Sequence, residues 1–111
     1  MKKIEAIIEP SKLEDVKVAL SEMGLHGLTV SEVKGFGHQN SHLEIYRGRE
    51  YVVDSLPKSK IEVVVTDRQL EQALEAITKS AQTGAISDGE ILVCPVERSV
   101  WIHAEELKLA G

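Results

Sequence analysis

The sequence is poor in cysteine, in aromatic residues and in long apolar runs. Its 111 residues include one cysteine, Cys94, which excludes an internal disulfide and a multi-cysteine zinc site. The four aromatic residues are Phe36, Tyr46, Tyr51 and Trp101, so the core has to be built from aliphatic side chains. No apolar run approaches a signal peptide or the roughly 20 residues of a membrane span. We therefore expect a cytoplasmic protein without direct membrane insertion.

Basic residues are also in short supply. Thirteen lysines and arginines stand against eighteen acidic residues, which gives a net charge of −5. Such a chain is not attracted to a phosphate backbone, so nucleic acid is not an expected partner. With 42% hydrophobic and 28% charged residues, the composition is that of a globular protein, and the length predicts a single domain over residues 1–111.

Alternating apolar residues predict four strands. They are expected over residues 4–8, 28–36, 61–66 and 91–96. The second strand departs from strict alternation, which indicates a bulge or an offset edge. The third strand is apolar on both faces and is expected at the centre of the sheet.

Two amphipathic segments predict two helices between these strands. In the first, Ser11 followed by Glu14 matches a capping box, and Gly24 is the expected stop. The second helix has the stronger apolar periodicity, and its predicted cap is Thr66 or Asp67.

Strand, helix and strand therefore occur twice, displaced by about 56 residues, which suggests a duplicated unit. The order βαββαβ predicts an α+β ferredoxin-like sandwich in which both helices cover one face of the sheet. The other face would expose apolar side chains such as Ile7 and Val64. Oligomerisation would cover them.

The connection between the second and third strands, residues 37–57, is long for so small a domain. It contains Tyr46 and Tyr51, and Phe36 stands at its root. One interpretation is a plain long β-hairpin with packed tyrosines. The other is a flexible docking or modification loop.

Motifs along the whole chain resemble the PII signal-transduction proteins of nitrogen metabolism. They are MKKIEAII (1–8), VKGFG (33–37), YRGREY (46–51), LPKSKIE (56–62), AQTG (81–84) and SDG (87–89), in the family's order and spacing. The resemblance implies a homotrimer with a ferredoxin-like fold, whose inter-subunit clefts bind ATP or ADP. It further implies that 2-oxoglutarate joins through Mg-ATP, and that the long loop docks onto a membrane transporter or a metabolic enzyme.

The resemblance also assigns roles to individual residues. Its nucleotide-binding candidates are Ile7, Gly35, Phe36, Gly37, His38, Gln39, Glu62, Val64, Thr83, Gly84, Ser87, Asp88 and Gly89. Its 2-oxoglutarate candidates are Gln39, Lys58 and Ser87, and Gln39 would also contact magnesium when ATP is bound. Tyr51 matches a tyrosine that is uridylylated in some relatives.

Without the family, these residues have simpler interpretations. Gln39 is then a solvated amide, Lys58 a surface lysine, and Glu62 and Val64 the outer face of a strand. The segment 83–89 is either an anion-binding nest or a glycine turn that ends a helix.

Four residues depart from the pattern of relatives that bind ATP. His38, Glu90, Trp101 and His103 stand where those relatives have cations. Each lost or reversed phosphate contact costs about 1.5 to 3 kcal/mol, which argues against strong ATP binding. The alternatives are ADP, AMP or another adenine ligand, a small anion, or the loss of nucleotide binding altogether. Trp101 would either stack on an adenine ring or anchor a subunit interface.

Three hypotheses follow. The leading one is a PII-like regulator that senses a small metabolite and controls a partner through residues 37–57. The alternative is a PII-like adaptor without ATP sensing, which docks constitutively or answers to a different ligand. An acylphosphatase-like enzyme on the same fold would need an arginine in the loop after the first strand, and residues 9–12 have none. We therefore do not expect an enzyme.

Overall fold

The computed structural model describes residues 1–36, 42–46, 49–53, 55–85, 88–102 and 108–109. Its main sheet has four antiparallel strands in the order β2, β5, β1, β6. Their bounds are Thr29–Phe36 for β2, Ser55–Val65 for β5, Lys2–Ile8 for β1 and Gly89–Pro95 for β6. With the two helices described next, this is the predicted ferredoxin-like arrangement. The third predicted strand, β5, is central as expected.

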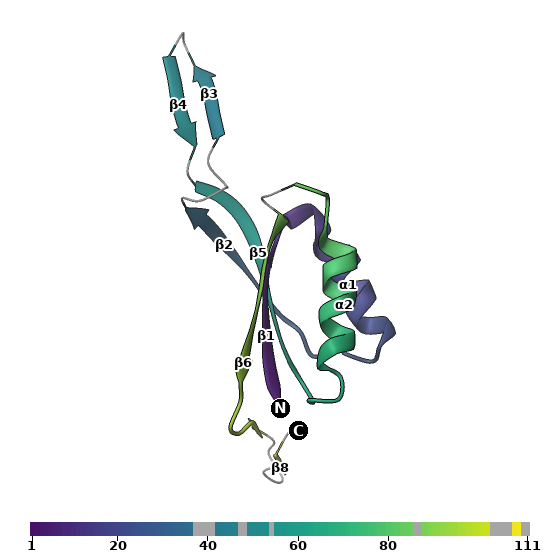
Figure 1. The fold of residues 1–111 in the computed structure, drawn as a ribbon. Coiled ribbons are helices and arrows are strands. Elements are labelled where there is room, and N and C mark those ends of the chain that lie inside the picture. The colour runs from purple at the N-terminus through teal and green to yellow at the C-terminus, as the bar shows by residue number, and fades with distance from the viewer. Residues whose placement is uncertain (37–41, 47–48, 54, 86–87, 103–107, 110–111) are drawn as a thin grey trace.

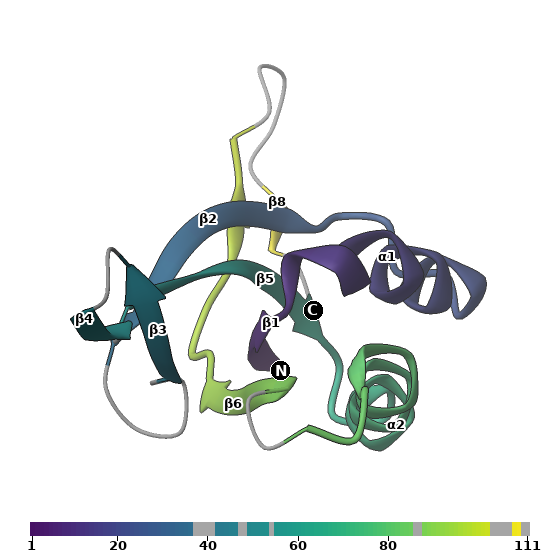
Figure 2. The same ribbon diagram turned by 90° about the horizontal axis from the view of Figure 1, so that it is seen from above.

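Both helices lie on the same side of this sheet (Figures 1 and 2). α1 spans Leu13–Glu22 and follows a 3-10 turn, η1, at Pro10–Lys12, while α2 spans Leu70–Ala81. The core between helices and sheet is aliphatic, as the scarcity of aromatic residues predicts. Its residues with 0% exposed surface are Ile4, Ala6, Val16, Leu20, Ile61, Ala73 and Ile77.

The start of α1 differs from the prediction. Ser11 and Glu14 do not form a capping box, because the chain enters the helix through η1 and the residue before α1 is Lys12, without a side-chain cap. Pro10 opens η1, where its fixed φ angle suits a helical start.

The end of α1 is as predicted. Gly24 has a φ angle of +86°, which glycine adopts without strain. The Leu25 amide donates to the Leu20 carbonyl at 3.0 Å, and the Gly24 amide donates to the Ser21 carbonyl at 2.9 Å. These two bonds form a Schellman motif, which satisfies carbonyls at the helix end.

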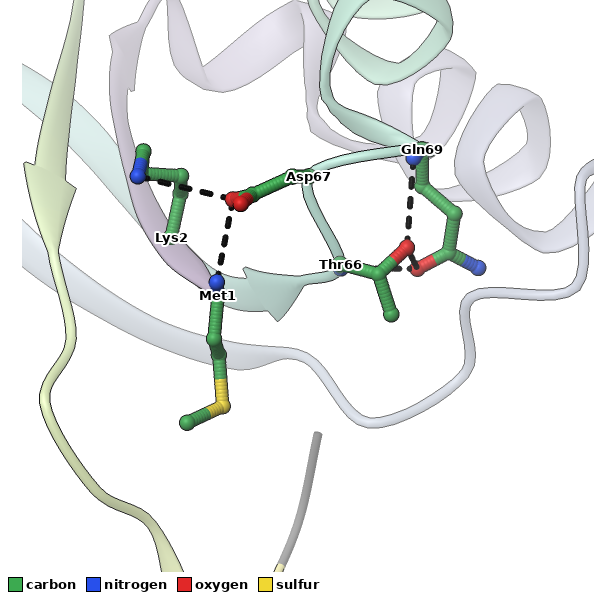
Figure 3. A network of polar contacts seen from close by, with 5 residues as sticks. All are labelled: Met1, Lys2, Thr66, Asp67 and Gln69. Carbon is green, nitrogen blue, oxygen red and sulfur yellow. Dashed lines mark hydrogen bonds and ion pairs between the residues drawn. The ribbon is translucent and has the colours of Figure 1, made fainter.

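The turn before α2 uses one of its two predicted caps. The Gln69 amide donates to Thr66 Oγ1 at 3.2 Å, and the Thr66 amide donates to Gln69 Oε1 at 3.0 Å (Figure 3). This reciprocal pair has the pattern of a capping box. The other candidate, Asp67, instead accepts a bond from the Met1 ammonium at 3.0 Å.

The second strand lies at the edge of the sheet, which agrees with one of the two predicted alternatives, and its pairing with β5 contains no bulge. β2 pairs with β5 in continuous register from Thr29 opposite Glu62 to Phe36 opposite Ser55. β5 is therefore longer than the predicted third strand. It begins at Ser55, since pairing with β2 holds its first residues in the sheet.

Part of the long connection is itself a hairpin. β3 (His42–Tyr46) pairs with β4 (Arg49–Val53), and Figure 1 shows this hairpin beyond the ends of β2 and β5. The backbone of Tyr51 lies opposite Glu44. Residues 55–57 belong to β5, so the predicted loop of 37–57 is shorter than expected. The role of this loop as a flexible docking segment stays a prediction.

A short ribbon follows the main sheet, formed by β7 (Val100–Trp101) and β8 (Lys108–Leu109).

In the part of the chain that the structure describes, neither helix is long and apolar enough to cross a membrane.

Candidate functional site

The face of the sheet turned away from the helices carries alternating lysines and glutamates. Glu5 and Glu62 are direct cross-strand partners, and like charges at such positions repel. Lys3 Nζ lies between them, 2.9 Å from a Glu5 oxygen and 3.4 Å from a Glu62 oxygen. Lys60 Nζ lies 3.6 Å from the other Glu62 oxygen. The hydrogen bond between Lys3 and Glu5 raises the pKa of Lys3 and lowers the pKa of the Glu5 carboxyl. The two lysines therefore offset the repulsion between the glutamates.

A cavity of about 440 Å³ adjoins this charge network. Its lining includes the predicted Glu62 and Val64, and adds Lys3, Thr29 and Trp101. Trp101 is 62% exposed, so most of the residue's surface is open to a second molecule.

Two of these lining residues were missed at the level of sequence. Thr29 lies opposite Glu62 in the β2–β5 ladder, and Lys3 lies opposite Val64 in the β1–β5 ladder. Paired residues share a face of the sheet, so the strand register would have identified both. The register was not available from the alternation pattern alone.

Three residues of the cavity lining, Met1, Thr66 and Gln69, belong to the polar network in Figure 3. The Met1 ammonium and Lys2 Nζ approach the same Asp67 oxygen, at 3.0 and 3.4 Å. The Asp67 pKa is lowered, mainly by the hydrogen bond from the Met1 ammonium. These contacts join the start of β1 to the turn before α2.

At the other end of β5, Lys58 is buried, with 2% of its side chain exposed. The interpretation as a surface lysine is therefore wrong. Lys58 Nζ donates to Glu9 Oε1 in a short charge-assisted hydrogen bond. The register explains the pair, because Ile8 lies opposite Ser59 and the next residues along the two strands are Glu9 and Lys58.

The turn between α2 and β6 holds a carboxylate of its own. Asp88 Oδ2 accepts from the Thr83 amide at 2.7 Å and from the Gly84 amide at 3.1 Å, and Asp88 Oδ1 accepts from the Thr83 hydroxyl. These bonds, led by the one from the Thr83 hydroxyl, lower the Asp88 pKa. The amides expected to form an anion-binding nest thus already bind an anion, the Asp88 side chain.

Gly89, next to this turn, lies tightly against β1. It has a φ angle of +127°, and a Cβ built there would lie 1.8 Å from the Ile7 carbonyl oxygen. Only glycine fits this position, because any side chain meets backbone that cannot move aside.

The described candidates fall into two groups at opposite ends of the sheet. One group is near the end of β2 and the start of β6, and comprises Ile7, Gly35, Phe36, Lys58, Thr83, Gly84, Asp88 and Gly89. The other lines the 440 Å³ cavity and comprises Glu62 and Val64. Lys58 and Glu62 are four positions apart along β5, which corresponds to about 13 Å. Within one chain, the described residues therefore place the two groups at separate ends of the sheet.

Other candidates lie outside the described residues. These are Gly37, His38, Gln39, Ser87 and His103. The structure therefore does not place the proposed magnesium ligand Gln39, and the roles of these residues stay predictions.

Comparison with known proteins identifies the family. A family model described as nitrogen regulatory protein P-II matches residues 1–106. The nitrogen regulatory protein P-II of Pasteurella multocida (strain Pm70) is 58% identical over 106 residues, which are 96% of this chain and 95% of that protein. Proteins of the same name from Azospirillum brasilense and Mesorhizobium japonicum are 60% and 61% identical over the same shares of both chains. The chain belongs to the P-II family of nitrogen regulatory proteins.

P-II proteins are signal-transduction regulators. The chain is accordingly a regulatory protein and not an enzyme, as its sequence predicts. The resemblance read from its motifs is confirmed over nearly the whole chain.

Within this P-II chain, two positions at which cations were expected are described. Glu90 is exposed on β6, with its backbone opposite Ile7, and Trp101 is exposed beside the cavity. Neither side chain carries a positive charge for a phosphate.

Proposed function

We propose that this P-II protein senses an adenine nucleotide, with 2-oxoglutarate as a second effector, in clefts between the subunits of a homotrimer. It then controls a transporter or a metabolic enzyme through the segment 37–57, in which Tyr51 is the candidate for modification. The observation that carries the proposal is the cavity that unites the predicted Glu62 and Val64 with the exposed indole of Trp101.

The open face of the sheet supports an oligomer. Val64 of β5 and Leu92 of β6 are 40% and 46% exposed, and Trp101 adds a large apolar surface. A neighbouring subunit would cover this surface. It would also bring its Lys58 end toward this chain's cavity, which accounts for the separation of the two candidate groups.

The chemistry of the cavity suits a nucleoside. Its volume of about 440 Å³ lies within the range of small-molecule sites. The Trp101 ring offers a stacking surface for a purine, and Thr29 and Glu62 offer polar groups to orient it.

The phosphate side is less favourable. A phosphate that binds the Thr83 and Gly84 amides has to displace the Asp88 carboxylate. Glu90 adds a second negative charge nearby. ADP and AMP are therefore expected to bind better than ATP. These same carboxylates favour the alternative, an adaptor that does not sense ATP.

Because Trp101 is the only tryptophan, its fluorescence reports on the cavity. We expect adenosine, AMP and ADP to change this fluorescence at micromolar to low millimolar concentrations, with a weaker response to ATP, with or without magnesium. Calorimetry on Trp101→Phe checks that the signal comes from a bound ligand: the heat should persist at reduced affinity while the fluorescence change disappears. Absence of both signals for every adenine ligand at millimolar concentration would contradict nucleotide sensing and favour the adaptor.

A further inference from the structure

Lys58 occupies an unusual position for a lysine. Its side chain is 2% exposed, although it lies on the sheet face that is turned away from the helices. An ammonium held away from water needs a negative partner, because desolvation of a charge is costly unless a counter-charge offsets it. Glu9 supplies one such partner.

Glu9 is placed differently from its partner. Its side chain is 31% exposed, so the carboxylate is able to turn into water without a large loss of hydration. Its backbone, in contrast, is fixed. The Glu9 carbonyl accepts from the Lys12 amide at 2.9 Å, and Pro10 follows it directly in η1. A change at this pair is therefore expected to be a side-chain rotation that leaves β1 and η1 in place.

We propose that Glu9 is a built-in competitor of the acidic effector: its carboxylate holds the Lys58 ammonium in the ligand-free protein, and a carboxylate of the effector has to displace it. The inference rests on the proposed function, since it takes Lys58 to be the anchor of 2-oxoglutarate. It adds to that function a role for Glu9, which would set the effector concentration at which the protein responds.

The exchange is chemically balanced. The effector carboxylate forms the bond to Lys58 that Glu9 gives up, and Glu9 gains hydration in return. Since one charge-assisted bond replaces another, the effector gains less binding free energy than it would from an ammonium that Glu9 did not hold. Glu9 therefore weakens the effector's apparent affinity, and it excludes neutral ligands, which are unable to displace a carboxylate.

The main test is calorimetry with 2-oxoglutarate on the full chain, in saturating Mg-ATP and separately in saturating Mg-ADP. Glu9→Gln keeps the size of the side chain and removes its charge. We expect this variant to bind 2-oxoglutarate at least about tenfold more tightly than the wild type. The matched control is Glu14→Gln, which removes an exposed glutamate that pairs with Lys17 at 3.3 Å on the surface of α1, and it should leave the affinity unchanged. An affinity of Glu9→Gln equal to or below that of the wild type would overturn the inference.

A second measurement decides the inference if neither protein binds 2-oxoglutarate, a result that would remove 2-oxoglutarate from the proposed function. The unfolding temperature of each ligand-free protein is compared in sodium acetate, sodium glutarate and sodium chloride at equal ionic strength. If Glu9 occupies a carboxylate site, the two carboxylates should stabilise Glu9→Gln relative to chloride by several degrees more than they stabilise the wild type. Equal responses of the two proteins would overturn the competitor role, whatever the identity of the effector.

Discussion

The two ends of β5 differ in how their polar groups are satisfied. At the Lys58 end, the Lys58 ammonium and the amides of Thr83 and Gly84, all expected to meet a ligand, already have anionic partners from the chain itself. These partners are Glu9 for Lys58 and Asp88 for the two amides. At the other end, the charges of Lys3, Glu5 and Glu62 pair among themselves and leave a cavity of about 440 Å³ beside them.

This difference separates two modes of binding. A ligand at the cavity fills space and covers the exposed Trp101, so its affinity comes from apolar contact and from a few polar groups. A ligand at the Lys58 end has to exchange partners, so its affinity is a difference between two similar interactions. Under the proposed function, the cavity end would hold a nucleoside, and the Lys58 end would respond to changes in an acidic effector.

The largest expected effect concerns the rigidity of the Lys58 end. In Gly89→Ala, the new Cβ would meet the Ile7 carbonyl oxygen at 1.8 Å, and alanine disfavours a φ angle of +127°. We expect a loss of at least about 3 kcal/mol in the free energy of unfolding, measured by urea denaturation.

The matched control is Gly27→Ala near the cavity, where an added Cβ meets nothing within 4 Å. This variant should change the free energy of unfolding by less than about 0.5 kcal/mol. If both variants lose the same stability, the contrast between a tightly packed end and an open end is wrong.

The elements of the fold were predictable because their signals are local. Gly24 stops α1 through its own φ angle, and the periodicity of α2 gives the bounds of its buried face. The capping box at Ser11 was wrong because Pro10 directs the chain into a 3-10 turn first. The length of β5 was also missed, since it depends on pairing with a strand that is distant in sequence.

The site was predictable only in part, for the same physical reason. The family resemblance pointed to Glu62 and Val64. That Lys3 and Thr29 lie beside them follows from the strand register, which pairs Lys3 with Val64 about 60 residues away and Thr29 with Glu62 33 residues away. The burial of Lys58 and its pairing with Glu9 likewise require the packed sheet. No pattern in residues 9 or 58 alone indicates that they touch.

A smaller effect is expected from Lys3 at the cavity end. In Lys3→Met, Glu5 and Glu62 stay directly opposite each other without the ammonium between them, so the unfolding temperature at pH 7 should fall. Added salt should recover part of the loss by screening the two carboxylates. The control is Lys79→Met, which removes an exposed pair with Glu75 on α2 and should have little effect. A loss in Lys3→Met that is independent of salt would contradict the role of Lys3 as a charge between two glutamates.

The smallest expected effect is a pH-dependent change in stability, which tests whether the Asp88 carboxylate holds the turn at the Lys58 end. Hydrogen bonds from Thr83 and Gly84 lower the Asp88 pKa below its ordinary value of 3.8. A carboxyl whose pKa is lower in the folded state contributes stability above its unfolded pKa, and this contribution disappears as the pH falls through the folded pKa. Asp88→Asn should therefore lower the unfolding temperature slightly at pH 7, and the difference from wild type should shrink below pH 3.8. Asp15→Asn, at an exposed aspartate of α1, is the comparison variant. A difference for Asp88→Asn that stays constant from pH 7 to pH 2.5 would show that the carboxylate charge does not hold the turn, and the turn would then be open to an external anion.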